Sequence, residues 1–153
     1  MAKPSETRDL AADSWTWPDQ RWQAIVNKVR AGRSLKPKQW PGKAKVAVSF
    51  SFDSDHESST LRWGESSPGK LSQGEYGSRV AVPRIKNLLA RNHIKASFFV
   101  PAVVAKIHPH EQRELTDAGH EIGIHGWIHE LNSKLPKVAE RDLMMRAADT
   151  LEE

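Results

Sequence analysis

Lys45-Val46-Ala47-Val48-Ser49-Phe50-Ser51-Phe52-Asp53-Ser54-Asp55 is the stretch of this sequence that decides the fold. Bulky apolar residues stand at positions 46, 48, 50 and 52, and small or polar residues stand between them. Because successive side chains of a strand point to opposite faces, one face is apolar and the other polar. Asp53 and Asp55 have the same parity. The stretch therefore predicts a strand that packs under a helix and ends in two carboxylates.

The remainder of the chain continues as an alternation of strands and helices. We expect further strands at 96–100 and 121–125, helices at 78–91, 109–118 and 138–153, and a long Ser- and Gly-rich loop at 54–77. Long loops in compact domains are often functional. This order predicts parallel strands with helical crossovers, hence the α/β class. Three such units leave open sheet edges, which predicts that the chain is a fragment of a longer barrel.

The chain divides into two parts in this interpretation. Residues 1–44 form an N-terminal arm with a short helix at 19–30 and a linker rich in Gly and Pro. Residues 45–153 form the N-terminal half of an α/β domain that would carry the active site. Exposed strand edges in that half predict self-association, so a homo-oligomer is one expected state.

Composition excludes several functional classes. The 153 residues are 38% hydrophobic and 27% charged, which is typical of a soluble globular protein. Cysteine is absent, which excludes disulfides, thiolate metal sites and a cysteine nucleophile. The net charge of +4 is spread along the chain, and no long apolar run occurs. We therefore expect a cytoplasmic protein with neither nucleic acid nor membrane as a partner.

Two segments carry the groups that could perform chemistry: residues 51–57 and residues 120–130. Each lies where a strand should end, and the C-terminal strand ends of parallel α/β folds line the active site. His125 and His129 are four residues apart, so one turn of chain can present both to one ion. Two imidazoles and a carboxylate suit a divalent cation such as Zn²⁺. One aspartate can complete the metal site while the other takes a proton from water that the ion activates.

Other interpretations of these residues remain open. Asp53 could cap a turn and Asp55 could be a solvated loop residue. Trp127 could line the pocket or belong to the core, and Arg79 could bind an anionic or carbonyl group of a substrate or be solvated. Glu57 and Glu130 could orient the ligands or be exposed. Weaker candidates are the remaining histidines: His56, His93, His108, His110 and His120.

From about Lys45 to its end the chain resembles the polysaccharide deacetylase family, which shares the NodB homology domain. The resemblance is carried by four motifs in order: Val48-Ser49-Phe50-Ser51-Phe52-Asp53-Ser54-Asp55, Gly74-Glu75-Tyr76-Gly77-Ser78-Arg79-Val80-Ala81-Val82-Pro83-Arg84, Ala96-Ser97-Phe98-Phe99-Val100-Pro101, and residues 119–130. It implies a distorted (β/α)7 barrel, a divalent metal and hydrolytic N-deacetylation. By this analogy Asp53 is the catalytic base, while Asp55, His125 and His129 hold the metal.

In the commoner family pattern the two aspartates are adjacent, whereas Ser54 separates them in this chain. This Asp-x-Asp form resembles the subgroup of peptidoglycan deacetylase-like proteins, cyclic imidases and allantoinase-like enzymes, some of which work without the usual metal chemistry. The family's late histidine and late arginine motifs do not occur in these 153 residues.

Three functions follow as expectations. The first is metal-dependent hydrolysis of a non-peptide carbon–nitrogen bond, namely N-deacetylation of a polysaccharide or peptidoglycan-type carbohydrate. The second is ring opening of a small cyclic imide or ureide by the same residues. The third is a non-catalytic carbohydrate-binding or truncated fragment.

Overall fold

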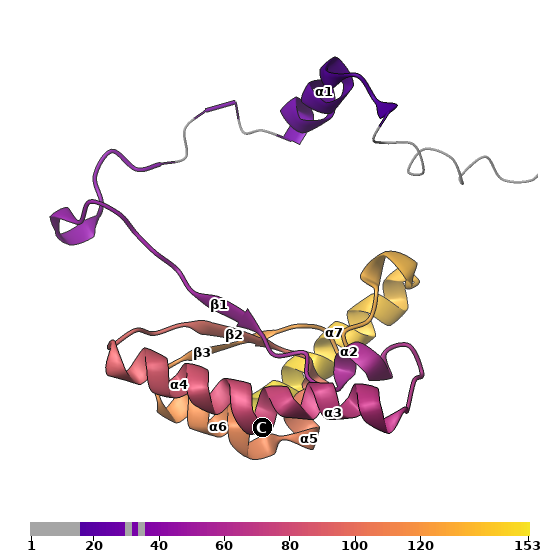
Figure 1. Cartoon of the computed structure of the whole chain (residues 1–153). Helices are drawn as coiled ribbons and strands as arrows, with labels where there is room; N and C mark the ends of the chain where they lie inside the picture. Colours follow the sequence, from indigo (N-terminus) through magenta and orange to yellow (C-terminus); the bar gives the residue numbers. More distant parts are fainter. Residues whose placement is uncertain (1–15, 30–31, 34–35) are drawn as a thin grey trace, which may run out of the picture. The chain divides into compact units, whose positions relative to one another are not determined.

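A computed structural model describes residues 16–29, 32–33 and 36–153 (Figure 1). The described residues fall into two units, which divide between Ala47 and Val48. The described part of the first unit contains helix α1 (Asp19–Val29) and the short 3-10 turn η2 (Pro41–Lys43). Helix α1 confirms the helix expected at 19–30, whereas the arm expected over residues 1–15 lies outside the described residues. None of the described helices has the length and apolar character that crossing a bilayer requires.

The second unit is built on a parallel sheet in the order β1 (Ser51–Asp53), β2 (Ser97–Val100) and β3 (Glu121–Ile124). Phe52, Phe98 and Ile122 lie side by side across it. The three expected strands are confirmed, but the expectation that the first strand begins at Lys45 is wrong. The carbonyl of Phe50 still accepts from the N–H of Ser97 at 3.1 Å, but β2 begins at Ser97, so no described strand pairs with the chain before Phe50. Val46 and Val48 are accordingly 70% and 71% exposed.

A long helical segment connects β1 to β2. It consists of α2 (Ser58–Leu61), α3 (Pro68–Tyr76), the π-helical η3 (Gly77–Ala81) and α4 (Val82–Arg91). The expectation of a structureless loop at 54–77 is therefore wrong for the residues of α2 and α3. Helix α3 has Pro68 at its start but buries none of its residues. Because no apolar stripe marks it, the periodicity that reveals amphipathic helices is missing.

Two helices, α5 (Ala102–Ile107) and α6 (Pro109–Asp117), connect β2 to β3, and α7 (Lys137–Glu152) follows β3 after the 3-10 turn η4 (Asn132–Lys134). Helices α6 and α7 confirm the expected helices at 109–118 and 138–153. Helix α5 was not expected. Its first N–H groups, from Ala102 and Val103, donate to the carbonyls of Gly126 and Trp127 at 3.1 and 2.9 Å. The start of α5 thus depends on a tertiary contact that local sequence does not reveal.

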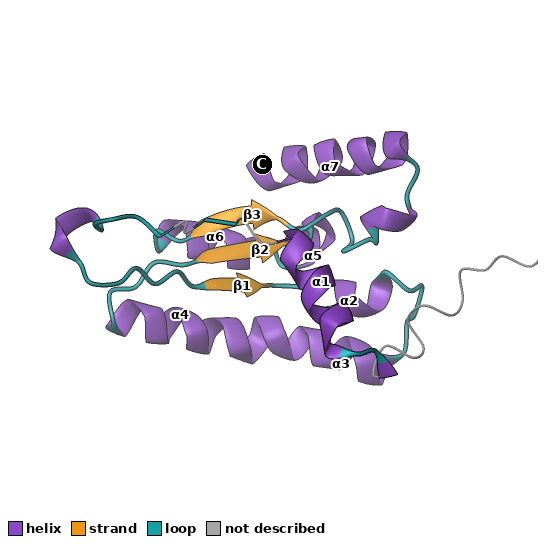
Figure 2. Ribbon diagram, turned by 90° about the horizontal axis from the view of Figure 1, so that it is seen from above, coloured by secondary structure: helices purple, strands orange, loops and turns teal. Residues whose placement is uncertain are grey.

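The core lies between the sheet and helices α4, α5 and α6, which share one side of it (Figure 1). Seen from above, α4 lies beyond β1 and α7 beyond β3 (Figure 2). Phe98 is fully buried and stacks on Phe52 at a centroid distance of 5.1 Å. Asp53 and Phe99 have the opposite parity to this pair and are exposed, so the Asp53 side chain belongs to the face of the sheet opposite the core.

Candidate metal centre

Asp55 follows β1 in a turn that is closed by hydrogen bonds to the Asp55 backbone carbonyl. The N–H of Ser54 donates to the carbonyl of Phe99 on the neighbouring strand at 2.8 Å, which continues the ladder by one residue. The carbonyl of Asp55 then accepts from both the backbone N–H (2.9 Å) and the hydroxyl (2.6 Å) of Ser58 at the start of α2. The Asp55 side chain is therefore presented from a fixed turn at the C-terminal end of the sheet.

The two histidines come from the segment after β3. His125 still belongs to the sheet edge, since its N–H donates to the carbonyl of Val100 at 3.1 Å. The chain then turns at Gly126, where φ is +80° and a Cβ would lie 3.1 Å from the carboxylate oxygens of Glu130. This turn brings the rings of His125 and His129 to a centroid distance of 4.7 Å.

Glu130 holds this turn closed. Its carboxylate accepts the backbone N–H groups of Trp127, at 3.0 Å, and Ile128, at 2.8 Å. Burial alone would raise the pKa of Glu130, but these N–H groups and the neighbouring His129 lower the pKa below its usual value, so the anion is favoured. The expectation that Glu130 orients the ligand loop thus has a direct physical basis.

Asp55, His125 and His129 meet in a geometry that suits a cation. Asp55 Oδ1 lies 3.4 Å from His125 Nε2, and Asp55 Oδ2 lies 3.5 Å from His129 Nε2. Ligands placed tetrahedrally at Zn²⁺ bond lengths are separated by about 3.3 Å, which is longer than a usual hydrogen bond. Oδ1 is buried and, within the described part of the chain, has no hydrogen-bond partner. The donor set and the unpartnered oxygen therefore fit a divalent ion.

These three residues form the one His/Asp/Glu cluster of this kind that residues 16–29, 32–33 and 36–153 contain. Their side chains are between 23% and 31% exposed, so the cluster opens to solvent. Asp53 ends β1 just before it and lines a cleft of about 360 Å³ together with Asp55. The chain thus places a second carboxylate in the cleft that Asp55 lines.

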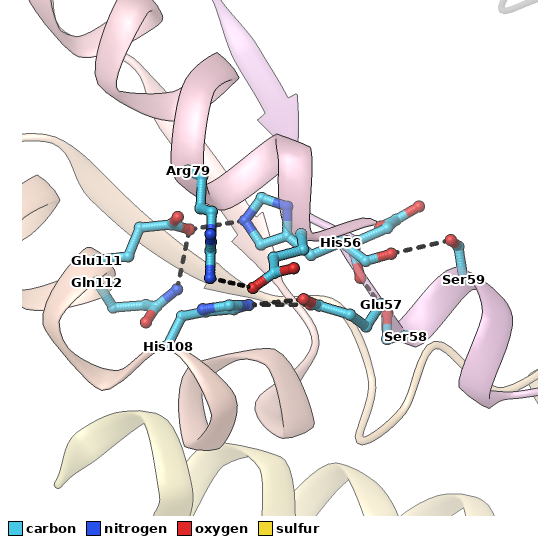
Figure 3. A network of polar contacts seen from close by, with 10 residues as sticks. His56, Glu57, Ser58, Ser59, Arg79, His108, Glu111 and Gln112 are labelled. Atoms are coloured by element: carbon cyan, nitrogen blue, oxygen red, sulfur yellow. Dashed lines mark hydrogen bonds and ion pairs between the residues drawn. The ribbon is translucent and has the colours of Figure 1, made fainter. Parts of the chain in front are cut away.

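The two residues expected to bind substrate lie in different surroundings. Trp127 is in the histidine turn, and the guanidinium of Arg146 from α7 stacks on its ring at 3.6 Å. Arg79 is on the π-helical segment, where it pairs with Glu75 at 2.8 Å and is 74% exposed. Figure 3 shows Arg79 beside the polar network that His56, Glu57, His108 and Glu111 form.

Sequence analysis missed Arg62 and Glu111, and it did not predict the contacts of the weaker candidates His56 and His108. Arg62, at the end of α2, donates from its guanidinium to the ring of His129. His108, expected at the surface, pairs with Glu57, and the buried His56 pairs with Glu111 (Figure 3). The 55-residue separation of His56 and Glu111 leaves no local pattern to detect. The one available signal was the pair of glycines at 74 and 77, which indicates a close backbone approach.

Comparison with known proteins places the chain in a family. The sequence profile of the polysaccharide deacetylases matches residues 74–153. A peptidoglycan deacetylase of Helicobacter pylori is 27% identical over 111 residues, which cover 71% of this chain and 38% of that protein. The chain therefore spans well under half the length of this curated relative.

Solved structures of a polysaccharide deacetylase and of an allantoinase also resemble this chain. A protein of Mycobacterium smegmatis assigned to the polysaccharide deacetylases superposes with a TM-score of 0.70 at 36% identity, over 76% of this chain and 42% of that one. PuuE allantoinase superposes with a TM-score of 0.68 at 29% identity, over 76% and 46% of the two chains. Since the family profile covers more than half of the residues and the matched region holds both histidines, the chain belongs to the polysaccharide deacetylase family.

Proposed function

We propose that this chain carries the metal-binding part of a hydrolase that cleaves non-peptide carbon–nitrogen bonds, with N-deacetylation of a polysaccharide or peptidoglycan-type carbohydrate as its reaction. The observation that supports this most is the meeting of Asp55, His125 and His129 from opposite edges of the sheet. Membership of the deacetylase family supports the bond type. In this proposal the described strands are part of a (β/α)7-type barrel.

Each residue of the site has a separate role in this proposal. Asp55, His125 and His129 hold the divalent ion, with Zn²⁺ as the ion that best suits two imidazoles and a carboxylate. A bound ion of this kind lowers the pKa of water and polarises a carbonyl. Asp53 lines the same cleft as Asp55, and in this proposal it accepts the proton that the attacking water loses. Trp127 and Glu130 keep the histidine turn in shape.

A second candidate reaction is ring opening of a cyclic imide or ureide. The superposition on PuuE allantoinase, at 29% identity, favours it specifically. Both reactions begin with water attacking a carbonyl carbon that is bonded to nitrogen, so the same ligands and base serve either one. The two differ in the shape of the substrate, which is an extended acetylated sugar in one case and a small planar ring in the other.

Metal analysis tests the site itself. The full chain is purified, stripped with a chelator, and titrated with Zn²⁺, alongside the Asp55→Asn and His125→Gln variants. We expect stoichiometric binding to the original chain and loss of binding in both variants. His110→Gln is a matched control, because this histidine is exposed and lies outside the cluster. Equal Zn²⁺ binding by all four proteins would remove the proposed site.

A substrate panel then separates the reactions. Acetate release is measured from N-acetylglucosamine oligomers and peptidoglycan fragments, and ring opening is measured with succinimide and allantoin. Acetate release that disappears in Asp53→Asn supports the first function. Turnover of the rings alone supports the second. A chain that binds Zn²⁺ and carbohydrate but turns over neither class would be a binding fragment, which is the third function.

A further inference from the structure

A second polar network joins the two residues that follow Asp55 in sequence to the α5–α6 region (Figure 3). His56 Nε2 donates to Glu111 Oε1 at 2.8 Å, and these side chains are only 5% and 8% exposed. Glu57 accepts from His108 Nε2 at 2.9 Å, with side-chain exposures of 11% and 18%. The two residues that follow Asp55 are thus each attached to the α5–α6 region by a largely buried ion-pair contact.

The backbone of these two loop residues is also confined. His56 has a φ of +43°, a left-handed conformation that residues other than glycine adopt only with support. Its ring packs on Gly77, where a Cβ would overlap the ring Nδ1. A Cβ at Gly74 would lie 2.5 Å from the backbone nitrogen of Glu57. Contacts from α3 and η3 on one side and from α6 on the other therefore hold the loop.

The buried carboxylate of Glu111 is held in its charged form. Burial alone would raise the pKa of Glu111, but hydrogen bonds from His56 and Ser78, together with the charges of His56 and His108, lower it. A buried pair of this kind contributes little net stability compared with apolar side chains of the same volume. Its distinctive effect is to fix the direction of the groups that it joins, here the loop that carries Asp55.

We infer that Glu111 and His108 are positioning residues for the metal centre: through His56 and Glu57 they hold the loop so that the Asp55 carboxylate faces both imidazoles. This inference rests on the proposed metal site. Asp55 is the residue immediately before His56, and its carbonyl and its carboxylate are set by the same turn. A shift of the loop by a few tenths of an ångström would therefore move Oδ1 and Oδ2 relative to His125 and His129.

Two substitutions in the full chain test this, each with a matched control. Glu111→Gln and His108→Gln alter the network but retain side chains that can form hydrogen bonds. Glu114→Gln and His110→Gln introduce the same changes at exposed positions of α6. Zn²⁺ affinity is measured by competition with a chromophoric chelator, and the Co²⁺ absorption spectrum reports the coordination geometry. The unfolding free energy of each metal-free protein is measured in urea.

We expect Glu111→Gln and His108→Gln to weaken Zn²⁺ binding about 10-fold or more and to alter the Co²⁺ spectrum, as changes to groups that orient metal ligands do. The two controls should match the original chain. Affinity and spectrum equal to those of the controls would overturn the positioning role while leaving the metal site intact. Absence of Zn²⁺ binding in the original chain would instead overturn the proposed function as well.

Loss of folding is also informative. Should Glu111→Gln not fold, the more exposed His108–Glu57 pair carries the test through His108→Gln alone. Unfolding of both variants would overturn the inference, because the network would then support the whole unit and not the direction of one ligand.

Discussion

Arg62 contacts His129 at two atoms: its guanidinium donates to the ring Nδ1 and, at 3.3 Å, to the backbone carbonyl of the same residue. An arginine side chain has only donors, whereas a neutral imidazole that binds a metal through Nε2 carries its proton on Nδ1. The contact of Arg62 with Nδ1 and ligation of an ion by His129 therefore compete. The guanidinium charge also opposes a cation at this position.

Arg62→Met should consequently tighten Zn²⁺ binding. We expect roughly a 10-fold gain in affinity, which corresponds to about 1.4 kcal/mol. Competition with a chromophoric chelator measures it. Arg79→Met is the control, because Arg79 is exposed and pairs with Glu75 away from the ligands. A weaker affinity in Arg62→Met would show that Arg62 supports the histidine and does not compete with the ion.

Substitution should distinguish the role of Asp55 from the role of Asp53. Asp55→Asn removes a charged ligand and should abolish Zn²⁺ binding, whereas Asp53→Asn should leave the affinity unchanged. If the chain turns over a substrate, Asp53→Asn should lower kcat by a factor of about 10² to 10⁴, the usual contribution of a general base. Metal titration and steady-state rates of both variants provide the check. Loss of Zn²⁺ from Asp53→Asn would make that residue a ligand.

Close backbone packing at Gly74 predicts a stability difference within one helix. A Cβ at Gly74 would meet the backbone of His56 and Glu57, which cannot yield as a flexible side chain would. Gly74→Ala should therefore lower the unfolding free energy by about 1–3 kcal/mol. Gly69→Ala, also in α3, meets nothing within 4 Å and should be neutral or slightly stabilising. Urea denaturation distinguishes them, and equal stabilities would argue against the close approach.

His120 should make the stability of the chain depend on pH. Its side chain is buried, and its Nδ1 accepts the N–H of Ala96 at 3.3 Å. Burial, followed by the charges of Lys95 and Lys86, lowers the pKa of His120 below 6.5. As the pH falls below 6.5, the unfolded chain takes up this proton first, so the unfolding free energy decreases until the pH passes the folded pKa.

His120→Gln keeps an acceptor for Ala96 but cannot titrate. Its unfolding free energy should therefore change less than that of the original chain between pH 7 and pH 5. Urea titrations at each pH measure the two slopes, and His110→Gln, at an exposed position, should retain the original slope. Identical slopes in all three proteins would show that another group dominates this pH range.

Much of the sheet could be predicted from local pattern. Phe52, Phe98 and Ile122 carry an alternation that depends only on the two-residue period of a strand, and they align in the structure. The histidine spacing and the Asp-x-Asp pattern likewise predicted which side chains meet, because both segments lie at the C-terminal edge of one parallel sheet. Helix α3 could not be predicted in the same way, since its surface carries no apolar stripe.

The contacts that His56 and Glu57 make could not be predicted from local pattern, unlike the role of Glu130 in the histidine turn. The partners of His56 and Glu57 lie on a helix pair that is remote in sequence, and nothing in the segment around Pro109 distinguishes the half-buried His108 from the exposed His110. Their difference arises from which side of the helix start faces the β1 loop. Such a preference appears only once the elements have packed together.

β2 separates the two strand ends that supply the ligands, because Asp55 follows β1 and both histidines follow β3. An ion held there would link the ends of β1 and β3 without a ligand from β2, which lies between them. Backbone amides of β1 and β3 should then exchange with deuterated solvent more slowly once Zn²⁺ is added. Those of β2, already bonded on both sides, should gain much less protection.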